Sequence, residues 1–513
     1  MNLIKSTAVV SFFTLLSRMA GFVRDALFAR FFGASVWTDA FVVAFKIPNF
    51  MRRIFAEGSF SLAFIPVLNE IKAKNNELYL KQFINHVLGC LLAVLLIVLA
   101  VLELLAPGLI MVFGPGFMDK PEVFTEAVNM VRITLPYLLF ISLVAFSSGI
   151  LNSFGKFAAA AATPILLNAV MILSMIYFRH EFHVPIMSLA WGVLVAGAVQ
   201  LAFQIPFLVR LGVIPKPVVR FHDPEVKKVM TLMLPTLLGS SVAQINLLID
   251  TMIATLLPLV GSPTYLYYSD RLLEFPLGLF GIAISTVILP KLAQTFAERK
   301  QQEYQQTLRW AMSLAMFVAL PSALGMLMLA KPIVITLFAY DQFTLQSASY
   351  TSYSLMVFML GLPAFVANKV LLPAFYSRKD TKSPVKIALK AMLVNAILNF
   401  AFVGILYYYQ VVSLHMGLAM AGVSSAWMQC YWLYRKLKQD QVIQEPLLNF
   451  VYVLKLIASL FVMGMVLFLA LSYGIEWYQL KWYDRCINLF VIIMLAASSY
   501  LISMWLLKAK KDF

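Results

Sequence analysis

The sequence predicts an all-α polytopic membrane protein, and two observations carry that prediction. First, 61% of the 513 residues are hydrophobic and 12% are charged, whereas soluble globular domains are about 45–50% apolar and about 25% charged. Second, long apolar runs recur along the chain, without the roughly ten-residue alternating pattern of β-barrel strands. Because a spanning helix needs about 20 apolar residues, the chain has room for roughly 12–14 of them.

About fourteen apolar segments are long enough to be transmembrane helices. We expect them near residues 6–30, 36–62, 83–113, 128–152, 158–178, 185–209, 230–258, 264–290, 308–330, 346–372, 384–409, 411–434, 449–473 and 484–507. Cys90, Cys430 and Cys486 lie singly within such segments, which gives neither a disulfide framework nor a cysteine metal site.

The distribution of lysine and arginine predicts the orientation. Loops after even-numbered segments are basic, for example 210–228 and 378–386, whereas 340–347 after an odd-numbered segment has no lysine or arginine. Positive loops stay in the cytoplasm, so both termini are expected there. The net charge of +16 is explained by these loops and does not indicate a nucleic-acid partner.

Short matches at a common spacing indicate an internal repeat. The motif at 150–154 recurs at 371–375, and Thr163-Pro164 corresponds to Ser383-Pro384. A similar spacing relates 64–68 to 288–292. We therefore expect two parallel six-helix repeats plus two C-terminal helices, with an N-terminal lobe at 1–215, a C-terminal lobe at 216–440 and an appended pair at 441–513. Parallel repeats around a central site are a known transporter plan.

The first two apolar segments contain charges that are costly in a membrane. They are Arg18, Arg24, Asp25 and Arg30 in the first, and Asp39, Lys46, Arg52, Arg53 and Glu57 in the second. An arginine at the bilayer centre costs about 2.5–3.5 kcal/mol on insertion scales, so such residues usually face a protein interior or a water-filled cavity. The excess is positive, which favours an anionic substrate. Arg30, Lys46 and Arg53 have an alternative interpretation, in which they extend to the membrane interface.

The eighth segment contains a comparable cluster, Tyr267 to Pro276. Asp270 and Glu274 are one helical turn apart, and Arg271 lies beside them. The repeat places this cluster opposite the second segment, so Arg271 is expected to join the arginines of the first half. The planar guanidinium of arginine suits phosphate oxygens, and the acids are expected to hold the arginines in place.

These segments resemble a known family. The stretches SRMAGFVRDALFARFFGA, TDAFVVAFKIPNFMRRIFAEGSFS and YYSDRLLEFP are closely similar to those of the MurJ (MviN) proteins, the lipid II flippases of peptidoglycan synthesis within the MOP exporter superfamily. The resemblance extends over essentially the whole chain. It implies that Arg18, Arg24, Arg52 and Arg271 are cavity arginines. It also implies that Asp25, Asp39, Asn49, Glu57 and Glu274 are neighbouring polar positions of the substrate site.

The resemblance also implies a function. It predicts a non-enzymatic transporter of the bacterial cytoplasmic (inner) membrane that moves undecaprenyl-diphosphate-linked peptidoglycan precursor to the outer leaflet by alternating access. This transport would support cell wall organisation and cell shape. Its partners would be lipid II, membrane lipids and cell-wall synthesis proteins, and the last two segments would form a groove for the lipid tail. The alternatives are a flippase for another polyprenyl-diphosphate saccharide, a drug–cation antiporter, a non-transporting scaffold and a lipid-diphosphate enzyme.

No cofactor is expected, but the binding of one monovalent cation is left open. Asp250 in the seventh segment, with Asn395 and Asn399 in the eleventh, offers oxygen ligands for a monovalent cation such as Na⁺. Asparagine on packed membrane helices is also a common interhelical hydrogen-bonding residue. His180 and His183 share a short external loop without a third ligand and are expected to be solvated.

Overall fold

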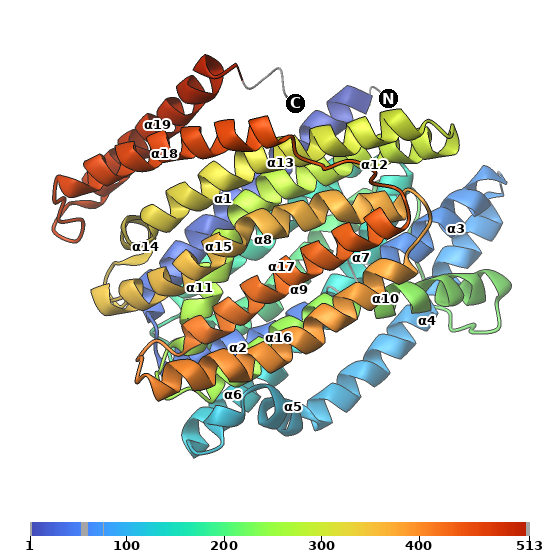
Figure 1. The fold of residues 1–513 in the computed structure, drawn as a ribbon. Coiled ribbons are helices and arrows are strands. Elements are labelled where there is room, and N and C mark those ends of the chain that lie inside the picture. The colour runs from blue at the N-terminus through green and yellow to red at the C-terminus, as the bar shows by residue number, and fades with distance from the viewer. Residues whose placement is uncertain (1–2, 53–59, 75, 509–513) are drawn as a thin grey trace. The chain divides into compact units, whose positions relative to one another are not determined.

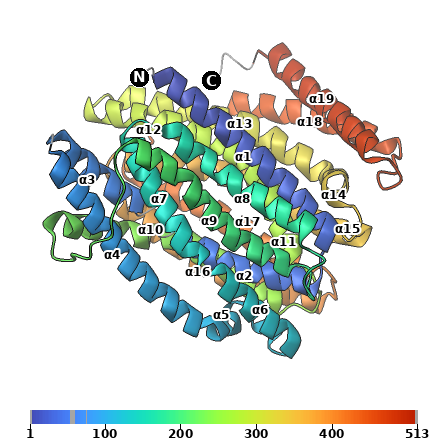
Figure 2. The same ribbon diagram turned by 180° about the vertical axis from the view of Figure 1, so that it is seen from behind.

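The computed structural model describes residues 3–52, 60–74 and 76–508. The described residues form helices joined by turns and loops, with no β-strand among them, which confirms the predicted all-α class. The chain divides into two compact units, residues 1–260 and 261–513. Figures 1 and 2 show the helices from opposite sides. The lobe boundaries predicted from the repeat stay a prediction.

The first unit contains ten α-helices and one short 3₁₀ turn within its described residues. These elements are α1 Leu3–Phe32, α2 Val36–Arg52, α3 Ser61–Ala73, α4 Glu77–Leu104, α5 Ala106–Phe113, η2 Pro115–Phe117, α6 Pro121–Thr134, α7 Tyr137–Ser153, α8 Phe157–Tyr177, α9 Met187–Arg210 and α10 Pro224–Thr255. Helix α8 packs between α1 and α9, and α9 also packs against α7.

The second unit contains nine α-helices and a π-helical turn within its described residues. These elements are α11 Ser262–Pro276, η3 Leu277–Gly281, α12 Ile282–Ala297, α13 Gln301–Met328, α14 Ala330–Phe338, α15 Leu345–Tyr376, α16 Lys382–Tyr408, α17 His415–Gln439, α18 Phe450–Ser472 and α19 Trp482–Leu506. Helix α15 is central to this unit, because α11, α12, α13, α14 and α17 all pack against it.

Ten helical segments of the described chain are long and apolar enough to cross a membrane. The predicted apolar segments fall on helices or on pairs of consecutive helices, although part of the second segment lies outside the described residues. The chain is therefore a multi-pass membrane protein, and the count of about fourteen spans stays a prediction.

The ends of α7 and α15 share a local arrangement that supports the predicted repeat. Lys72 Nζ donates to the carbonyl oxygen of Ser153 at 2.6 Å and lies 4.1 Å from the ring centre of Phe154. In the second unit, Arg378 Nε donates to the carbonyl of Ala374 at 3.1 Å, and its guanidinium lies over the Phe375 ring. Each pair of ring and carbonyl residues is separated by 221 positions. A cation thus caps the equivalent helix end in both units.

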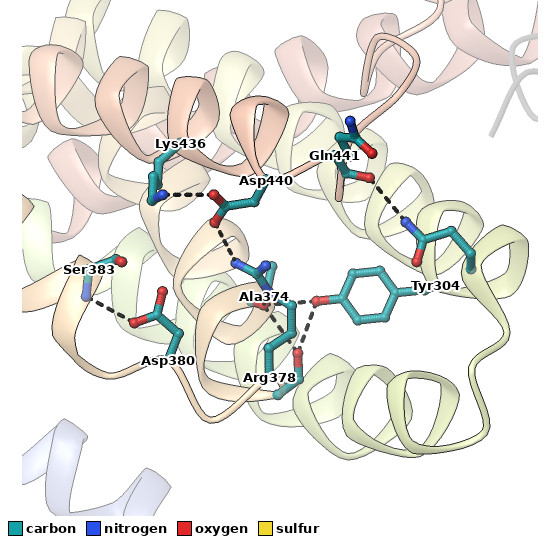
Figure 3. Close-up of polar contacts among 10 residues, drawn as sticks. Tyr304, Ala374, Arg378, Asp380, Ser383, Lys436, Asp440 and Gln441 are labelled. Carbon is teal, nitrogen blue, oxygen red and sulfur yellow. Dashed lines mark hydrogen bonds and ion pairs between the residues drawn. The ribbon is translucent and has the colours of Figure 1, made fainter.

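Further polar contacts fix the end of α15 (Figure 3). Tyr304 of α13 donates its hydroxyl to the same Ala374 carbonyl at 2.9 Å. Arg378 forms an ion pair with Asp440 at 3.4 Å, and Lys436 of α17 pairs with that carboxylate at 2.7 Å. The ends of α13, α15 and α17 are thereby tied together.

The connection between α9 and α10 lies against α4. The backbone N–H of Val218 donates to the carbonyl of Asn85 at 3.1 Å, and a Cβ on Gly89 would lie 2.3 Å from the Val218 backbone. Asp223 caps α10 by accepting from Glu225 N, and His86 Nδ1 lies 2.7 Å from its other oxygen. Burial raises the pKa of Asp223, but these hydrogen bonds outweigh burial and the net pKa is lowered. The Asp223 carboxylate is therefore ionised at neutral pH, and its stabilisation of the start of α10 is lost as the pH falls through the lowered pKa of Asp223.

Two tyrosines attach the C-terminal helices to α13. Tyr452 of α18 donates to the carbonyl of Ser313 at 3.0 Å, and Tyr500 of α19 donates to the carbonyl of Phe317 at 2.9 Å. The Phe317 carbonyl cannot receive the usual intrahelical hydrogen bond, because residue 321 is proline and has no N–H. Tyr500 therefore satisfies an acceptor that Pro321 leaves open in a low-dielectric environment.

We predict that Tyr500→Phe lowers the thermal unfolding midpoint of the purified protein, because a buried hydrogen-bonding group left unsatisfied costs about 1–3 kcal/mol. The control is Tyr473→Phe, since Tyr473 is 85% exposed. Adding Pro321→Ala should recover part of the loss, because alanine supplies the missing N–H. Equal midpoints for the wild type and Tyr500→Phe would contradict this account.

Candidate functional site

A buried ion pair lies within α1. The buried residues Gly21, Arg24, Asp25, Phe28 and Ala29 form a stripe at helical spacing, and α1 packs against α8. Within this stripe Arg24 Nη2 lies 2.6 Å from Asp25 Oδ1, and Arg24 Nε donates to the same oxygen at 3.0 Å. The two side chains are 9% and 1% exposed. The carboxylate compensates a charge that the surrounding helices would otherwise exclude.

Asn168 of α8 completes the environment of Arg24, and sequence reasoning missed it. Its Oδ1 accepts from Arg24 Nη1 at 3.1 Å, while its Nδ2 donates to the carbonyl of Ser17 at 3.1 Å and to that of Pro164 at 3.3 Å. Asn168 therefore joins α8 to α1 and fixes the guanidinium plane. The only sequence signal was a polar amide in an apolar helix, which does not identify its partner.

Arg18 and Arg30 occupy the exposed surface of α1. Arg18 has no side-chain hydrogen bond or ion pair with the described part of the chain. It shares the predicted face with Asp25 by spacing, but Asp25 is buried and pairs with Arg24. Arg18 is therefore accessible to a ligand, whereas Arg24 is held within the helix packing.

The second helix places several predicted residues along one element. Asp39 lies in its first turn and is buried, where the positive end of the helix dipole favours a carboxylate. Lys46 Nζ donates to Thr251 Oγ1 of α10 at 2.6 Å, and Arg52 Nε donates to Asn49 Oδ1 at 3.1 Å. Pro48 lies within the same helix, between Lys46 and Asn49.

Glu57 and Arg53 lie outside the described residues. The turn that sets the start of α2 is described: Gly33 has a φ of 60°, and Ser35 Oγ accepts from the Thr38 N–H at 3.2 Å. These two residues end α1 and begin α2, and therefore fix where Asp39 begins the second charged helix.

In the second unit, α11 carries the predicted Arg271 and Glu274. Arg271 Nη1 lies 3.0 Å from Glu274 Oε2, and both side chains are 40% exposed. Ser269 Oγ donates to the Thr351 carbonyl of α15 at 2.9 Å, and Tyr268 is fully buried against the ring of Phe338. One face of α11 is thus anchored, while Arg271, Asp270 and Glu274 remain partly accessible.

Two further cationic residues were missed by the sequence reasoning. Lys369 is half-buried in α15, and a Cβ on Gly281 would lie 3.4 Å from its Cγ. Gly281 ends the π-helical turn η3 after Pro276, a helix irregularity often found at functional sites. A lone lysine in an apolar helix was the available signal. Arg485 of α19 is buried and donates to the carbonyls of Ile335 and Ala339 at the end of α14, which explains it as a structural residue.

The residues of the candidate cation site occupy separate helices. Asp250 lies half-buried on α10, and Asn395 and Asn399 lie fully buried on α16. The described residues contain no group of three or more His, Cys, Asp or Glu side chains that could hold a metal ion. A monovalent cation site at the three residues stays a prediction.

Charged residues fixed inside the apolar helices of a multi-pass membrane protein are typical of substrate and ion pathways. The fold and the site therefore indicate a membrane transporter. Comparison with known proteins defines the family. The model of the family described as "Lipid II flippase MurJ" matches residues 28–483. A Vibrio cholerae relative named "Probable lipid II flippase MurJ" is 40% identical over 514 residues, covering 99% of this chain and 96% of the relative. The chain therefore belongs to the MurJ family of lipid II flippases, as its motifs indicated.

Solved structures agree with this assignment. A structure described as "Lipid II flippase MurJ, inward closed conformation" is similar with a TM-score of 0.76 and 25% identity, covering 97% of this chain and 98% of that one. An inward-facing multidrug resistance MATE family transporter of the MOP superfamily is similar in fold, with a TM-score of 0.67 and 13% identity over 85% of this chain. Both comparisons confirm a transporter fold.

We predict that Asn168→Ala weakens binding of a lipid diphosphate by about tenfold, because a hydrogen bond to a charged group contributes about 1.5–3 kcal/mol. The measurement is a titration of the purified protein with undecaprenyl diphosphate. Asn449→Ala is the control, since the Asn449 side chain accepts a hydrogen bond from the Val451 N–H at the start of α18 and not from an arginine. Unchanged affinity in a folded Asn168→Ala protein would show that Asn168 does not position Arg24 for binding.

Proposed function

We propose that this chain moves lipid II from the cytoplasmic to the outer leaflet by alternating access, using its intramembrane arginines to bind the diphosphate. The observation that supports this most directly is the fixed orientation of Arg24 by Asp25 and Asn168. A guanidinium held in one plane loses little conformational freedom on binding, and its geometry matches phosphate oxygens. The family assignment supplies the substrate.

Arg18, Arg52 and Arg271 complete the proposed diphosphate site. Arg18 is exposed, and Arg52 and Arg271 are partly exposed, so each of these guanidinium groups is accessible to a ligand. Asp25, Asp39, Asn49 and Glu274 are proposed to hold these cations and to limit the positive charge of the empty site. Glu57 is proposed for the same role. The polyprenyl tail stays in the lipid, next to the C-terminal helices α18 and α19.

The same proposal includes the orientation of the chain in the membrane and the two lobes that move during transport. Both termini are proposed to lie on the cytoplasmic side of the membrane, because the basic loops follow even-numbered segments. The membrane is proposed to be a bacterial inner membrane, in keeping with the family. Two six-helix lobes, residues 1–215 and 216–440, are proposed to rock against each other, with 441–513 as an appended pair. The equivalent cation caps on α7 and α15 support the duplication. Cell-wall synthesis proteins are proposed as further partners.

We predict that Arg→Ala substitutions at 18, 24, 52 and 271 abolish outward exposure of lipid II in cells depleted of their own flippase. Each variant removes a charge-assisted contact worth about 1.5–3 kcal/mol or more. Exposure and viability are measured at matched membrane levels. Arg435→Ala is the control, because Arg435 is exposed at the end of α17. Normal exposure in all four variants would instead favour a scaffold or a different substrate.

We also predict that the membrane potential drives the cycle. A diphosphate carrying two negative charges gains roughly 4–5 kcal/mol on moving outward through 100 mV, interior negative. The same field favours the return of an empty, positively charged site. Lipid II translocation is measured in proteoliposomes while the potential is clamped at different values and the proton and Na⁺ gradients are held constant. A rate that does not change with potential contradicts this mechanism and favours ion coupling, for example at Asp250, Asn395 and Asn399.

A further inference from the structure

A cavity separate from the charged helices lies between α6 and α9. It has a volume of about 350 Å³ and is bordered by Glu126, Asn129 and Arg132 of α6, by His183 in the connection after α8, and by Trp191 of α9. Helices α6 and α9 pack together within the first unit. The three residues of α6 are spaced three apart, so they present one row of polar groups to the cavity.

The polar groups of this cavity are free of hydrogen bonds and ion pairs to the described part of the chain. Glu126, Asn129, Arg132 and His183 make no side-chain hydrogen bond or ion pair with the described part of the chain. Glu103 of α4 attracts Arg132 electrostatically. Trp191 is 44% exposed at the cavity edge. By contrast, Gln204 on the same helix α9 bonds to Ser148 and Thr163. Four polar side chains that border one cavity and make no hydrogen bond or ion pair with the described residues indicate a place for a polar ligand.

The residue types narrow the class of ligand. Among the described residues, no cluster of His, Cys, Asp and Glu suits a metal ion. A simple anion would meet the carboxylate of Glu126 as well as the guanidinium of Arg132 in this lining, and a lipid chain would leave the polar groups unsatisfied. A carboxylate, an amide, a guanidinium and an imidazole together provide both donors and acceptors, and an indole provides a flat apolar face. A sugar ring needs this combination, since its hydroxyls donate and accept while its C–H face packs on an aromatic ring.

We propose that the cavity between α6 and α9 binds a saccharide on the outer side of the membrane. Its volume lies near the lower end of the range for small-molecule pockets, about 300–1,000 Å³, which suits a short saccharide. The outer location rests on the proposed function and its topology, in which the connection between α8 and α9 is external. The saccharide comes either from the head group of translocated lipid II or from an assembled glycan strand, and both share the amino-sugar chemistry.

The test uses the full-length protein in nanodiscs with chitooligosaccharides of increasing length as probes, followed by saturation-transfer NMR and calorimetry. Saturable binding is expected for the wild type, with at least a tenfold loss in Trp191→Ala and in Asn129→Ala. Trp310→Ala is the matched control, because Trp310 is similarly exposed at 42%. Affinity that is complete with a disaccharide identifies the head group as the source, and affinity that rises with length identifies a glycan strand.

Two outcomes overturn the proposal: no binding by the wild type, or equal binding by the wild type and the folded Trp191→Ala and Asn129→Ala variants. Either result would leave Trp191 as an interfacial residue of the aromatic belt. Lipid II translocation by the Arg24→Ala variant is measured in parallel. If Arg24→Ala loses translocation while the wild type binds no saccharide, only the saccharide site is rejected. If Arg24→Ala retains translocation, the proposed transport site is rejected.

Discussion

The arrangement of the first unit depends on a positive charge buried in an apolar helix. Arg24 is accommodated in α1 because Asp25 neutralises it and because Asn168 brings a second acceptor from α8. An uncompensated buried charge would cost several kcal/mol, so these contacts favour the close packing of α1 on α8. The same contacts fix the guanidinium in one orientation. A structural requirement of the membrane therefore prepares a group that suits a phosphate ligand.

Elsewhere in the structure, backbone carbonyl groups satisfy polar side chains that are buried between the helices. The carbonyl left open by Pro321 receives the Tyr500 hydroxyl, and Arg485 is satisfied by the carbonyls at the end of α14. In hydrocarbon, each unsatisfied backbone group is costly, so these side chains hold α19 against α13 and α14 within the second unit. A lysine or an arginine also caps the C-terminal end of α7 and of α15. Polar contacts thus anchor helices that hydrophobic burial alone holds weakly in lipid.

The sequence was sufficient for the fold class, because apolar runs of about 20 residues have one stable outcome in a membrane. It also placed Arg271 in one cluster with Asp270 and Glu274, but the pairing of Arg271 with Glu274 comes from the structure, because spacing alone did not decide which acid pairs with which arginine. It did not identify Asn168, because that residue is 144 positions from Arg24 and meets it only through helix packing. Lys369 was missed for lack of a charged neighbour in sequence. His183 was expected to be solvated; it is exposed, but it also borders the cavity between α6 and α9.

The central claim is that Arg24 acts through the geometry of its guanidinium and not only through its charge. The most direct test is the affinity of purified Arg24→Lys protein for lipid II, compared with the wild type across a range of salt concentrations. The account predicts that lysine, which keeps the charge but not the planar fork, lowers the affinity at least tenfold at every salt concentration. Wild-type affinity for Arg24→Lys at low salt would show that charge alone is sufficient, and would contradict the role assigned to Asp25 and Asn168.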